Sequence, residues 1–254
     1  MNLSEKLKAK QLTIGSWLTF GYTPTVEIMA KSGFDWLVID MEHTAIDDFA
    51  AQQMIQVISL AGCVPLVRVG KNDELLIKKV MDSGAHGVVV PMINTKKDAE
   101  EAVDYVKYPP IGKRGVGLSR AQNYGLGFQE YKEWIETNSI VIVQIEHIKA
   151  VENIQDILSV EGVDGFIIGP YDLSASLDLP GQFDNPKMIQ VIEDVSKFVK
   201  QSVKPGGYHV VHSNSQLLEQ KINDGYRFIA YGDDMVFFAE KIRSEENNWK
   251  NFIK

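Results

Sequence analysis

The run Gly165-Phe166-Ile167-Ile168-Gly169-Pro170-Tyr171-Asp172-Leu173-Ser174 shows the organisation of this chain most clearly. Its first four residues predict a short β-strand that is apolar on both faces, and Gly169-Pro170 ends that strand. Asp172 follows directly, at the predicted start of a helix. A buried strand that ends at a carboxylate and at free backbone N–H groups is typical of a functional site in an α/β protein.

On both sides of this run, short apolar segments alternate with longer helical patterns. The predicted strands cover residues 13–18, 36–39, 64–69, 87–90, 140–145, 165–168, 208–211 and 226–231. The predicted helices cover residues 24–32, 48–60, 72–83, 95–107, 130–136, 150–158, 186–201, 214–223 and 235–243. The segment 108–128 is rich in Gly and Pro and interrupts this alternation.

Strands that are apolar on both faces and alternate with amphipathic helices indicate an α/β protein in which helices cover a parallel sheet. The chain has about eight such units in roughly 250 residues, which matches a single (β/α)8 TIM barrel spanning residues 1–254. An open, doubly wound sheet is the alternative. It is disfavoured because no Gly-x-Gly-x-x-Gly pattern follows the first predicted strand.

The composition excludes several classes of partner. Apolar residues make up 44% and charged residues 24% of the chain, as in ordinary globular proteins. The net charge of −8, without any run of Lys or Arg, argues against nucleic acid or an anionic membrane surface as a partner. Cys63 is the only cysteine, which excludes an internal disulfide. We find no targeting segment or membrane-spanning apolar run, so we expect a cytoplasmic protein.

Polar side chains lie at or just after the C-terminal ends of four predicted strands, at the edge where the active site of a TIM barrel lies. They are Asp40, Glu42, His43, Arg68, Gln144, Glu146 and Asp172. A charge at the rim of an apolar strand needs a partner or a ligand. The predicted site is therefore this edge of the barrel.

Glu146 and Asp172 lie one βα unit apart, which places them at the same level on neighbouring strands. Two neighbouring carboxylates repel each other unless one is protonated or a cation lies between them. Mg²⁺ and Mn²⁺ are commonly held by two carboxylates, with water and substrate oxygens completing the coordination. The alternative is that each carboxylate only caps the helix that follows it. For the pair, we favour metal binding.

Arg68 and His43 each allow two interpretations. Arg68 lies in an otherwise apolar strand, where it forms either a structural salt bridge or, at the barrel mouth, a stabilising contact to an anion formed in the reaction. His43 is either an ordinary loop histidine or, beside Asp40 and Glu42, a base whose ring a carboxylate orients.

Several stretches together resemble the HpcH/HpaI aldolase family of metal-dependent class II pyruvate aldolases, whose barrel is of the phosphoenolpyruvate/pyruvate superfamily type. The resemblance spans essentially the whole chain in the same order. It rests on Val38-Ile39-Asp40-Met41-Glu42-His43, Pro65-Leu66-Val67-Arg68-Val69, Val90-Pro91-Met92, Tyr108-Pro109-Pro110-Ile111-Gly112-Lys113-Arg114-Gly115-Val116-Gly117, Gln144-Ile145-Glu146 and the run from Gly165 to Ser174.

The resemblance implies a divalent metal that is bound by Glu146 and Asp172, with Gln144 nearby. Mg²⁺ or Mn²⁺ is expected, with Co²⁺ or Zn²⁺ as the alternatives. Pyruvate would chelate this metal, and backbone N–H groups around Gly169, Tyr171 and Asp172 would receive its carboxylate.

The resemblance further implies that His43 acts as the base through a metal-bound water, while Arg68 and the metal stabilise the pyruvate enolate. The carboxylate that pairs with His43 matches Asp82, supplied by a neighbouring subunit. The implied assembly is a homo-oligomer, a trimer or a hexamer, in which the C-terminal helix and tail are exchanged between subunits.

The implied activity is that of an enzyme similar to 4-hydroxy-2-oxoheptanedioate or 2-dehydro-3-deoxyglucarate aldolase, which reversibly cleaves a 4-hydroxy-2-oxo acid to pyruvate and an aldehyde. A Schiff-base mechanism is disfavoured because the predicted strands 140–145 and 165–168 contain no lysine. Two alternatives are an acyl-CoA ester lyase of the malyl- or citramalyl-CoA type and a barrel that binds an oxo acid without turnover. The first alternative needs a basic surface, and this acidic chain shows no basic cluster beyond Lys113-Arg114.

Five residues depart from the family pattern and leave the aldehyde open. Met41 stands in place of Gly, Tyr171 in place of Ala, and His147 follows Glu146 in place of Thr. His209 and His212 lie at the exit of the seventh predicted strand, near the barrel mouth. We interpret His209 and His212 as polar loop residues in preference to metal ligands, although both can alter the aldehyde pocket.

Overall fold

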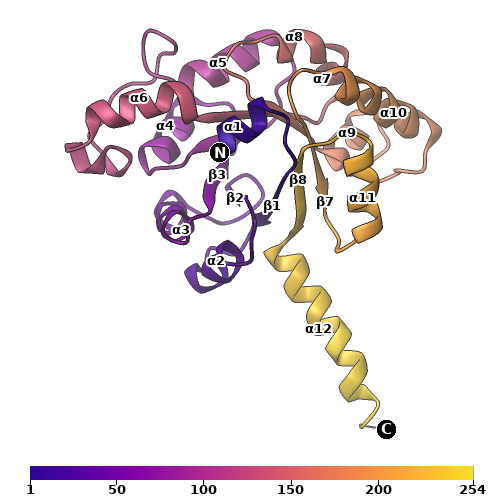
Figure 1. The fold of residues 1–254 in the computed structure, drawn as a ribbon. Coiled ribbons are helices and arrows are strands. Elements are labelled where there is room, and N and C mark those ends of the chain that lie inside the picture. Colours follow the sequence, from indigo (N-terminus) through magenta and orange to yellow (C-terminus); the bar gives the residue numbers. More distant parts are fainter. Residues whose placement is uncertain (254) are drawn as a thin grey trace.

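Eight parallel strands form a closed barrel in the computed structural model, which describes residues 1–253 (Figure 1). Each strand pairs with the next in sequence, and the last pairs with the first. The strands are β1 (Thr13–Leu18), β2 (Trp36–Asp40), β3 (Val64–Arg68), β4 (Gly87–Val90), β5 (Ile140–Ile145), β6 (Gly165–Ile168), β7 (Gly206–Val210) and β8 (Phe228–Asp233). The predicted (β/α)8 barrel is confirmed. Lys254, the last residue of the predicted domain, lies outside the described residues.

Helices surround the barrel (Figure 1). They are α1 (Leu3–Lys8), α2 (Thr23–Ala30), α3 (Asp48–Leu60), α4 (Glu74–Asp82), α5 (Lys96–Val106), the 3₁₀ turn η1 (Arg120–Gly125), α6 (Phe128–Asn138), α7 (Ile148–Glu152), α8 (Ile154–Leu158), α9 (Pro170–Ser176), α10 (Pro186–Gln201), α11 (Ser215–Asn223) and α12 (Asp234–Lys250). No helix among residues 1–253 combines the length and the apolar character needed to cross a membrane.

The barrel is filled by side chains, so it is a packed core and not a pore. The rings of Trp36 and Phe228 stack inside it, with their centroids 3.9 Å apart. Gly15 makes room for this stack, because a Cβ there would lie 2.1 Å from the Trp36 ring. A second, larger core lies between the strands and the helices. The filled interior leaves space for a ligand only at the ends of the barrel.

Several segments differ from the sequence-based prediction. The structure contains one helix that was not predicted, α1. A capping box between Asn2 and Glu5 marks its start. The predicted helix 150–158 is two helices, α7 and α8, joined at Asn153. β7 begins at Gly206, two residues before the predicted start. This start was missed because Gly206 and Gly207 have low strand propensity. β8 covers Phe228–Asp233 instead of residues 226–231.

The largest difference is α12, which runs to Lys250 instead of ending at residue 243. Its second half has little apolar pattern, and ion pairs four residues apart, Lys241 with Glu245 and Glu246 with Lys250, support the helix instead. Figure 1 shows α12 extending away from the barrel. Large apolar side chains on it, such as Phe238, Ile242 and Trp249, are exposed in the single chain. A helix of this kind normally buries its apolar residues against another element.

Candidate active site

A cavity of about 310 Å³ lies at the C-terminal ends of the strands. It brings together six of the residues predicted from the sequence, namely His43, Arg68, Gln144, Gly169, Tyr171 and Asp172. Its other walls include Trp17 at the end of β1 and His209 on β7. The predicted edge of the barrel is therefore a real concave site.

Arg68 is held in place from several directions at the end of β3. Its Nε and Nη2 donate hydrogen bonds to the two carboxylate oxygens of Asp40, at 2.9 and 2.7 Å. Its Nη1 lies 3.3 Å from Glu42 Oε2, and its guanidinium lies over the Trp17 ring, 4.5 Å from the centroid. Burial alone would raise the pKa of Asp40, but the hydrogen bonds and charge of Arg68 outweigh burial and lower it. Arg68 is thus a fixed cation at the cavity wall.

Glu146 is fixed just beyond β5 by two donors. Met92, whose φ of 54° lies in the left-handed region, donates its backbone N–H to Glu146 Oε1 at 2.6 Å. The Gln144 side-chain amide donates to Glu146 Oε2. Gly169 packs directly against this pair, because a Cβ there would lie 2.8 Å from the Glu146 Cβ and 3.2 Å from Gln144 Nε2. Only glycine fits at residue 169, so its role in the structure is to give Glu146 space.

The charges of three carboxylates, Glu42, Glu146 and Asp172, act on one another near this point. Burial raises the pKa of Glu146 to about 7, and the charges of Glu42 and Asp172 add to this effect. Burial also raises the pKa of Glu42, with Asp40 and Asp172 adding to the shift and Arg68 opposing it. A cation placed among these groups would relieve their mutual repulsion.

The donor set fits a hard divalent ion. Gln144 Oε1 and Glu42 Oε2 are buried acceptors that have no hydrogen-bond partner within residues 1–253. Among the same residues, no three or more His, Cys, Asp or Glu side chains are grouped tightly enough to form a complete metal site. Two protein carboxylates with open positions for water and substrate suit Mg²⁺ or Mn²⁺ better than Zn²⁺, which usually takes three or four protein ligands.

The raised pKa of Glu146 predicts a pH-dependent stability of the metal-free protein. Glu146 titrates near pH 7 when folded and near its ordinary value of 4.5 when unfolded, so the folded state holds the extra proton between these values. Ionisation of Glu146 therefore lowers the free energy of unfolding as the pH rises through that window. We expect Glu146→Gln to be more stable than the wild type at about pH 8, by at most about 3 kcal/mol, and to match it near pH 4. Urea unfolding at both pH values measures this difference, and a pH-independent difference would contradict the assignment.

The start of α9 offers backbone donors beside Asp172. Pro170 occupies the first turn of this helix, and the N–H groups of Tyr171 and Asp172 follow it. Backbone N–H groups in a first turn have no partner inside the helix. Tyr171 is 57% exposed, and its ring packs edge-on against Phe183, with centroids 4.9 Å apart. Tyr171 thus contributes its backbone and one wall to the cavity.

His43 lies at the mouth of the cavity, in the loop after β2. Its backbone N–H donates to Asp40 Oδ1 at 3.3 Å, and its Nε2 lies 3.8 Å from Glu42 Oε2. Its side chain is 61% exposed. The ring is therefore free to reach a substrate, with a carboxylate beside it.

Asp82 is not in this cavity. It ends α4, which runs back from the end of β3 toward the start of β4, so Asp82 lies at the opposite end of the barrel from His43. Its Oδ1 is 3.5 Å from Arg114 Nη1. Burial raises the pKa of Asp82, and Arg114 and Lys78 oppose the shift. A pairing of Asp82 with His43 consequently requires two copies of the chain.

Two of the three unassigned histidines have structural roles, and the third lies in the site. His147 caps α7 by accepting the Lys149 N–H on Nδ1 at 3.1 Å. His212 Nδ1 lies 3.1 Å from Glu240 Oε1 on α12. His209 lines the cavity from β7 and is therefore a strand residue, not the polar loop residue that the sequence analysis took it for.

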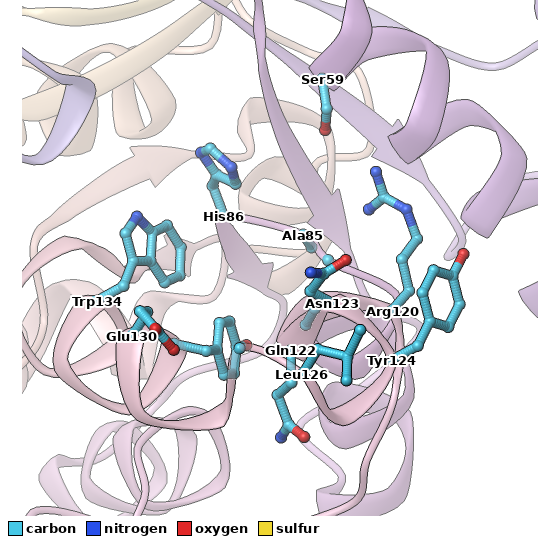
Figure 2. Close-up of a pocket in the computed structure, with 14 residues that line it drawn as sticks. Ser59, Ala85, His86, Arg120, Gln122, Asn123, Tyr124, Leu126, Glu130 and Trp134 are labelled. Carbon is cyan, nitrogen blue, oxygen red and sulfur yellow. The ribbon is translucent and has the colours of Figure 1, made fainter.

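A larger cavity, of about 740 Å³, lies at the other end of the barrel (Figure 2). Its lining comes from residues 84–86 before β4, from η1 and from α6, and includes His86, Arg120 and Trp134. Among the described residues that line it, Glu130 is the only one with a carboxylate side chain. Since TIM barrels carry their chemistry at the C-terminal ends of the strands, the smaller cavity is the candidate active site.

Comparison with known proteins gives matches over nearly the whole chain. A family model described as HpcH/HpaI aldolase/citrate lyase matches residues 14–240. The hydroxypyruvate/pyruvate aldolase of Sagittula stellata is 35% identical over 244 residues, covering 96% of this chain and 95% of that protein. The 2-keto-3-deoxy-L-rhamnonate aldolase of Escherichia coli is 34% identical over 242 residues, covering 94% of this chain and 89% of that protein.

A solved structure agrees with the sequence comparisons. An HpcH/HpaI aldolase/citrate lyase family protein from Burkholderia cenocepacia superposes with a TM-score of 0.91 at 30% identity. The match covers 98% of each chain.

Proposed function

Because this chain belongs to the HpcH/HpaI aldolase/citrate lyase family, we propose that it is a metal-dependent class II aldolase that reversibly cleaves a 4-hydroxy-2-oxo acid to pyruvate and an aldehyde. The observation that carries this proposal is that Asp172 and the fixed cation of Arg68 line one small cavity, while the charge of Asp172 also acts on the buried Glu146. These residues supply a possible cation-binding pair and a positive group at the same end of the barrel. Relatives named as aldolases of pyruvate and of a 2-keto-3-deoxy acid support the same reaction class.

Cleavage breaks the C3–C4 bond and moves its electron pair into the pyruvate carbonyl, so negative charge develops on that oxygen. Glu146 and Asp172 would hold a divalent ion, which would supply a Lewis acid to stabilise this charge. Arg68 adds a second positive group, and its ion pair with Asp40 fixes its direction before the reaction starts. The enolate is thus stabilised without any covalent bond to the enzyme.

The other groups bind and orient the substrate. The backbone N–H groups of Tyr171 and Asp172 hold the pyruvate carboxylate at the start of α9. The Gln144 amide lies beside Glu146 and closes the inner wall. His43, at the cavity mouth, accepts the proton from the C4 hydroxyl as the bond breaks.

An assay of pyruvate release from 4-hydroxy-2-oxo acids of different length and charge tests this proposal. It is run with Mg²⁺, Mn²⁺, Co²⁺ and Zn²⁺ in turn, and with excess chelator. We expect release that depends on a divalent ion, with Mg²⁺ or Mn²⁺ as the native ion. Full activity in chelator would exclude the metal mechanism, and activity confined to malyl- or citramalyl-CoA would favour the acyl-CoA lyase. The cytoplasmic location stays a prediction, which cell fractionation tests.

We further propose that the active unit is a homo-oligomer, a trimer or a hexamer, in which one subunit supplies Asp82 to the His43 of another. Val116 and Leu118, on the segment beside Asp82, are 55% and 72% exposed, as an apolar contact surface would be. The exposed apolar residues of α12 are consistent with exchange of this helix between subunits.

Mixing two inactive variants tests the shared site. His43→Ala and Asp82→Ala each lack one partner, but a mixed oligomer would contain some sites with both. We expect activity to return when the two variants are unfolded together and refolded. No recovery, in mixed oligomers verified by mass spectrometry, would mean that the two residues do not act across subunits.

A further inference from the structure

Arg114 is a buried cation that has no part in the chemistry described above. It lies in the segment between α5 and η1, and its side chain has no exposed surface. Its guanidinium lies over the Tyr108 ring, with Cζ 4.3 Å from the centroid, and its Nη2 donates a hydrogen bond to the Tyr131 hydroxyl at 3.0 Å. A buried charge is costly unless it is paired. Asp82 supplies the only carboxylate that pairs with Arg114 among residues 1–253.

This pair joins one oxygen of the Asp82 carboxylate to the buried guanidinium. Arg114 Nη1 lies 3.5 Å from Asp82 Oδ1, and neither atom has a hydrogen-bond partner within residues 1–253. Both atoms are buried, so water and salt screen their attraction less than they screen a surface ion pair. The charge of Arg114 therefore holds Asp82 Oδ1 on the inner side of the carboxylate.

The second oxygen of the same carboxylate has no such anchor. Asp82 ends α4 and keeps 21% of its side chain exposed. Its Oδ2 lies beside Gly117, where a Cβ would come within 3.3 Å of this oxygen and crowd it. Ser119 donates its hydroxyl to the Asp82 backbone carbonyl at 2.9 Å and thereby fixes the end of the helix. Since Oδ1 is occupied by Arg114, Oδ2 is the oxygen left to pair with another group.

Two tyrosines fix the Arg114 guanidinium independently of Asp82. The Tyr131 hydroxyl, which accepts from Arg114, itself donates to the Met81 carbonyl in the last turn of α4 at 3.3 Å. The Tyr108 hydroxyl accepts from the side-chain amide of the buried Gln122 at 2.6 Å. These bonds connect α6 and the segment before it to the end of α4. The cation is thus part of a rigid support beneath the carboxylate.

The charge of Arg114 also affects the protonation of Asp82. Burial raises the pKa of Asp82, and the charge of Arg114, followed by that of Lys78, opposes the shift. The other titratable groups facing this carboxylate are the hydroxyls of Tyr108 and Tyr131, which stay neutral because burial raises the pKa of each. Without Arg114, burial would be less opposed, and Asp82 would take up a proton at a higher pH. A protonated Asp82 no longer stabilises a neighbouring imidazolium.

We propose that Arg114 is a positioning residue that anchors Asp82 Oδ1, keeps this carboxylate charged and so directs Oδ2 to the His43 of a neighbouring subunit. A fixed carboxylate of this kind orients an imidazole and stabilises its protonated form. The inference rests on the proposed function, in which Asp82 of one subunit pairs with His43 of another. It identifies the group in the donating subunit that prepares Asp82 for this role.

The pH profile of kcat/KM for pyruvate release in Arg114→Met tests this role. Methionine removes the charge and keeps a long, flexible side chain. We expect kcat/KM at the optimum to fall by about tenfold to a hundredfold, and the acidic limb of the profile to move up by about one pH unit. Arg114→Lys, which keeps the charge, should return the limb toward its wild-type position.

Arg120→Met is the matched control. Arg120 donates to the Ser83 carbonyl at 2.8 Å, directly after Asp82 in the chain, but it forms no ion pair with a carboxylate within residues 1–253. This variant should leave the pH profile unchanged. If Arg114→Met does not fold, Arg114→Gln replaces it as an uncharged side chain that can still donate a hydrogen bond.

Mixing of subunits shows whether Arg114 acts through Asp82. Both residues lie on the donating subunit, whereas His43 lies on the receiving one. Arg114→Met should therefore recover activity when it is refolded together with His43→Ala. Refolded together with Asp82→Ala, it should stay at its own residual level, because no subunit then carries both Arg114 and Asp82.

A double variant completes the test. Arg114→Met should lower kcat/KM by less than about twofold when Asp82 is already replaced by asparagine. A full further loss in that background, or an unchanged acidic limb in Arg114→Met, would overturn the proposal, since Arg114 would then only support the fold. Absence of metal-dependent pyruvate release in the wild type would instead reject the aldolase function, and the role of Arg114 with it.

Discussion

Replacing Asp172 with alanine is expected to remove the binding of metal and of pyruvate together. Asp172 supplies one of the two carboxylates of the proposed cation site, and its N–H lies in the first turn of α9. Loss of the carboxylate leaves Glu146 alone, and a single carboxylate holds a divalent ion only weakly. Pyruvate then loses its Lewis acid, and kcat/KM should fall by at least about a thousandfold.

Calorimetric titration of metal, and then of pyruvate, measures this effect. Asp184→Ala is a suitable control because Asp184 is an exposed carboxylate in the loop after α9. The control should bind both ligands as the wild type does. Unchanged metal affinity in Asp172→Ala would show that the central assignment of the site is wrong.

Replacing Arg68 with lysine is expected to slow the reaction strongly while leaving metal binding intact. Lysine keeps the positive charge but loses the paired hydrogen bonds to Asp40 and the flat stacking on Trp17. Since Arg68 acts on charge that develops in the transition state, kcat should fall by roughly a hundredfold to a thousandfold with a smaller change in KM.

Steady-state kinetics with a 4-hydroxy-2-oxo acid, and metal titration of the same sample, measure the two effects. Arg120→Lys, at the opposite end of the barrel, serves as the matched control. A fall in metal affinity equal to the fall in kcat would mean that Arg68 organises the metal site and does not act on the enolate. An unchanged kcat would remove Arg68 from the mechanism.

The barrel was predictable because its strands are buried on both faces. Runs such as Ile140–Ile145 and Gly165–Ile168 carry enough apolar residues to be recognised without knowledge of their neighbours. The start of β7 was not predicted because Gly206 and Gly207 have no strand preference of their own. They adopt strand geometry because they pair with β6 and β8. The full length of α12 was not predicted because ion pairs on its surface, and not a repeat of apolar residues, support its second half.

The site was predictable where polar residues follow strand ends. Arg68, Gln144 and Asp172 line one cavity for that reason. Asp40 was considered only as a neighbour of His43, whereas it is the carboxylate that holds Arg68. Trp17 was missed as a wall residue, and His209 was placed near the mouth only as a loop residue, because their contact is a stack between β1 and β7, which are not adjacent in sequence or in the sheet. The role of Asp82 is likewise not visible in a single chain, since its proposed partner lies in another copy of the chain.

Exchange of the pyruvate methyl protons with deuterium, followed by NMR, tests the central claim most directly. It reports formation of the enolate alone, so it needs neither the aldehyde nor the physiological substrate. The account predicts exchange with Mg²⁺ or Mn²⁺ in the wild type, and its loss in excess chelator, in Asp172→Ala and in Glu146→Gln. Exchange at the full rate in chelator would contradict a metal-stabilised enolate in this cavity.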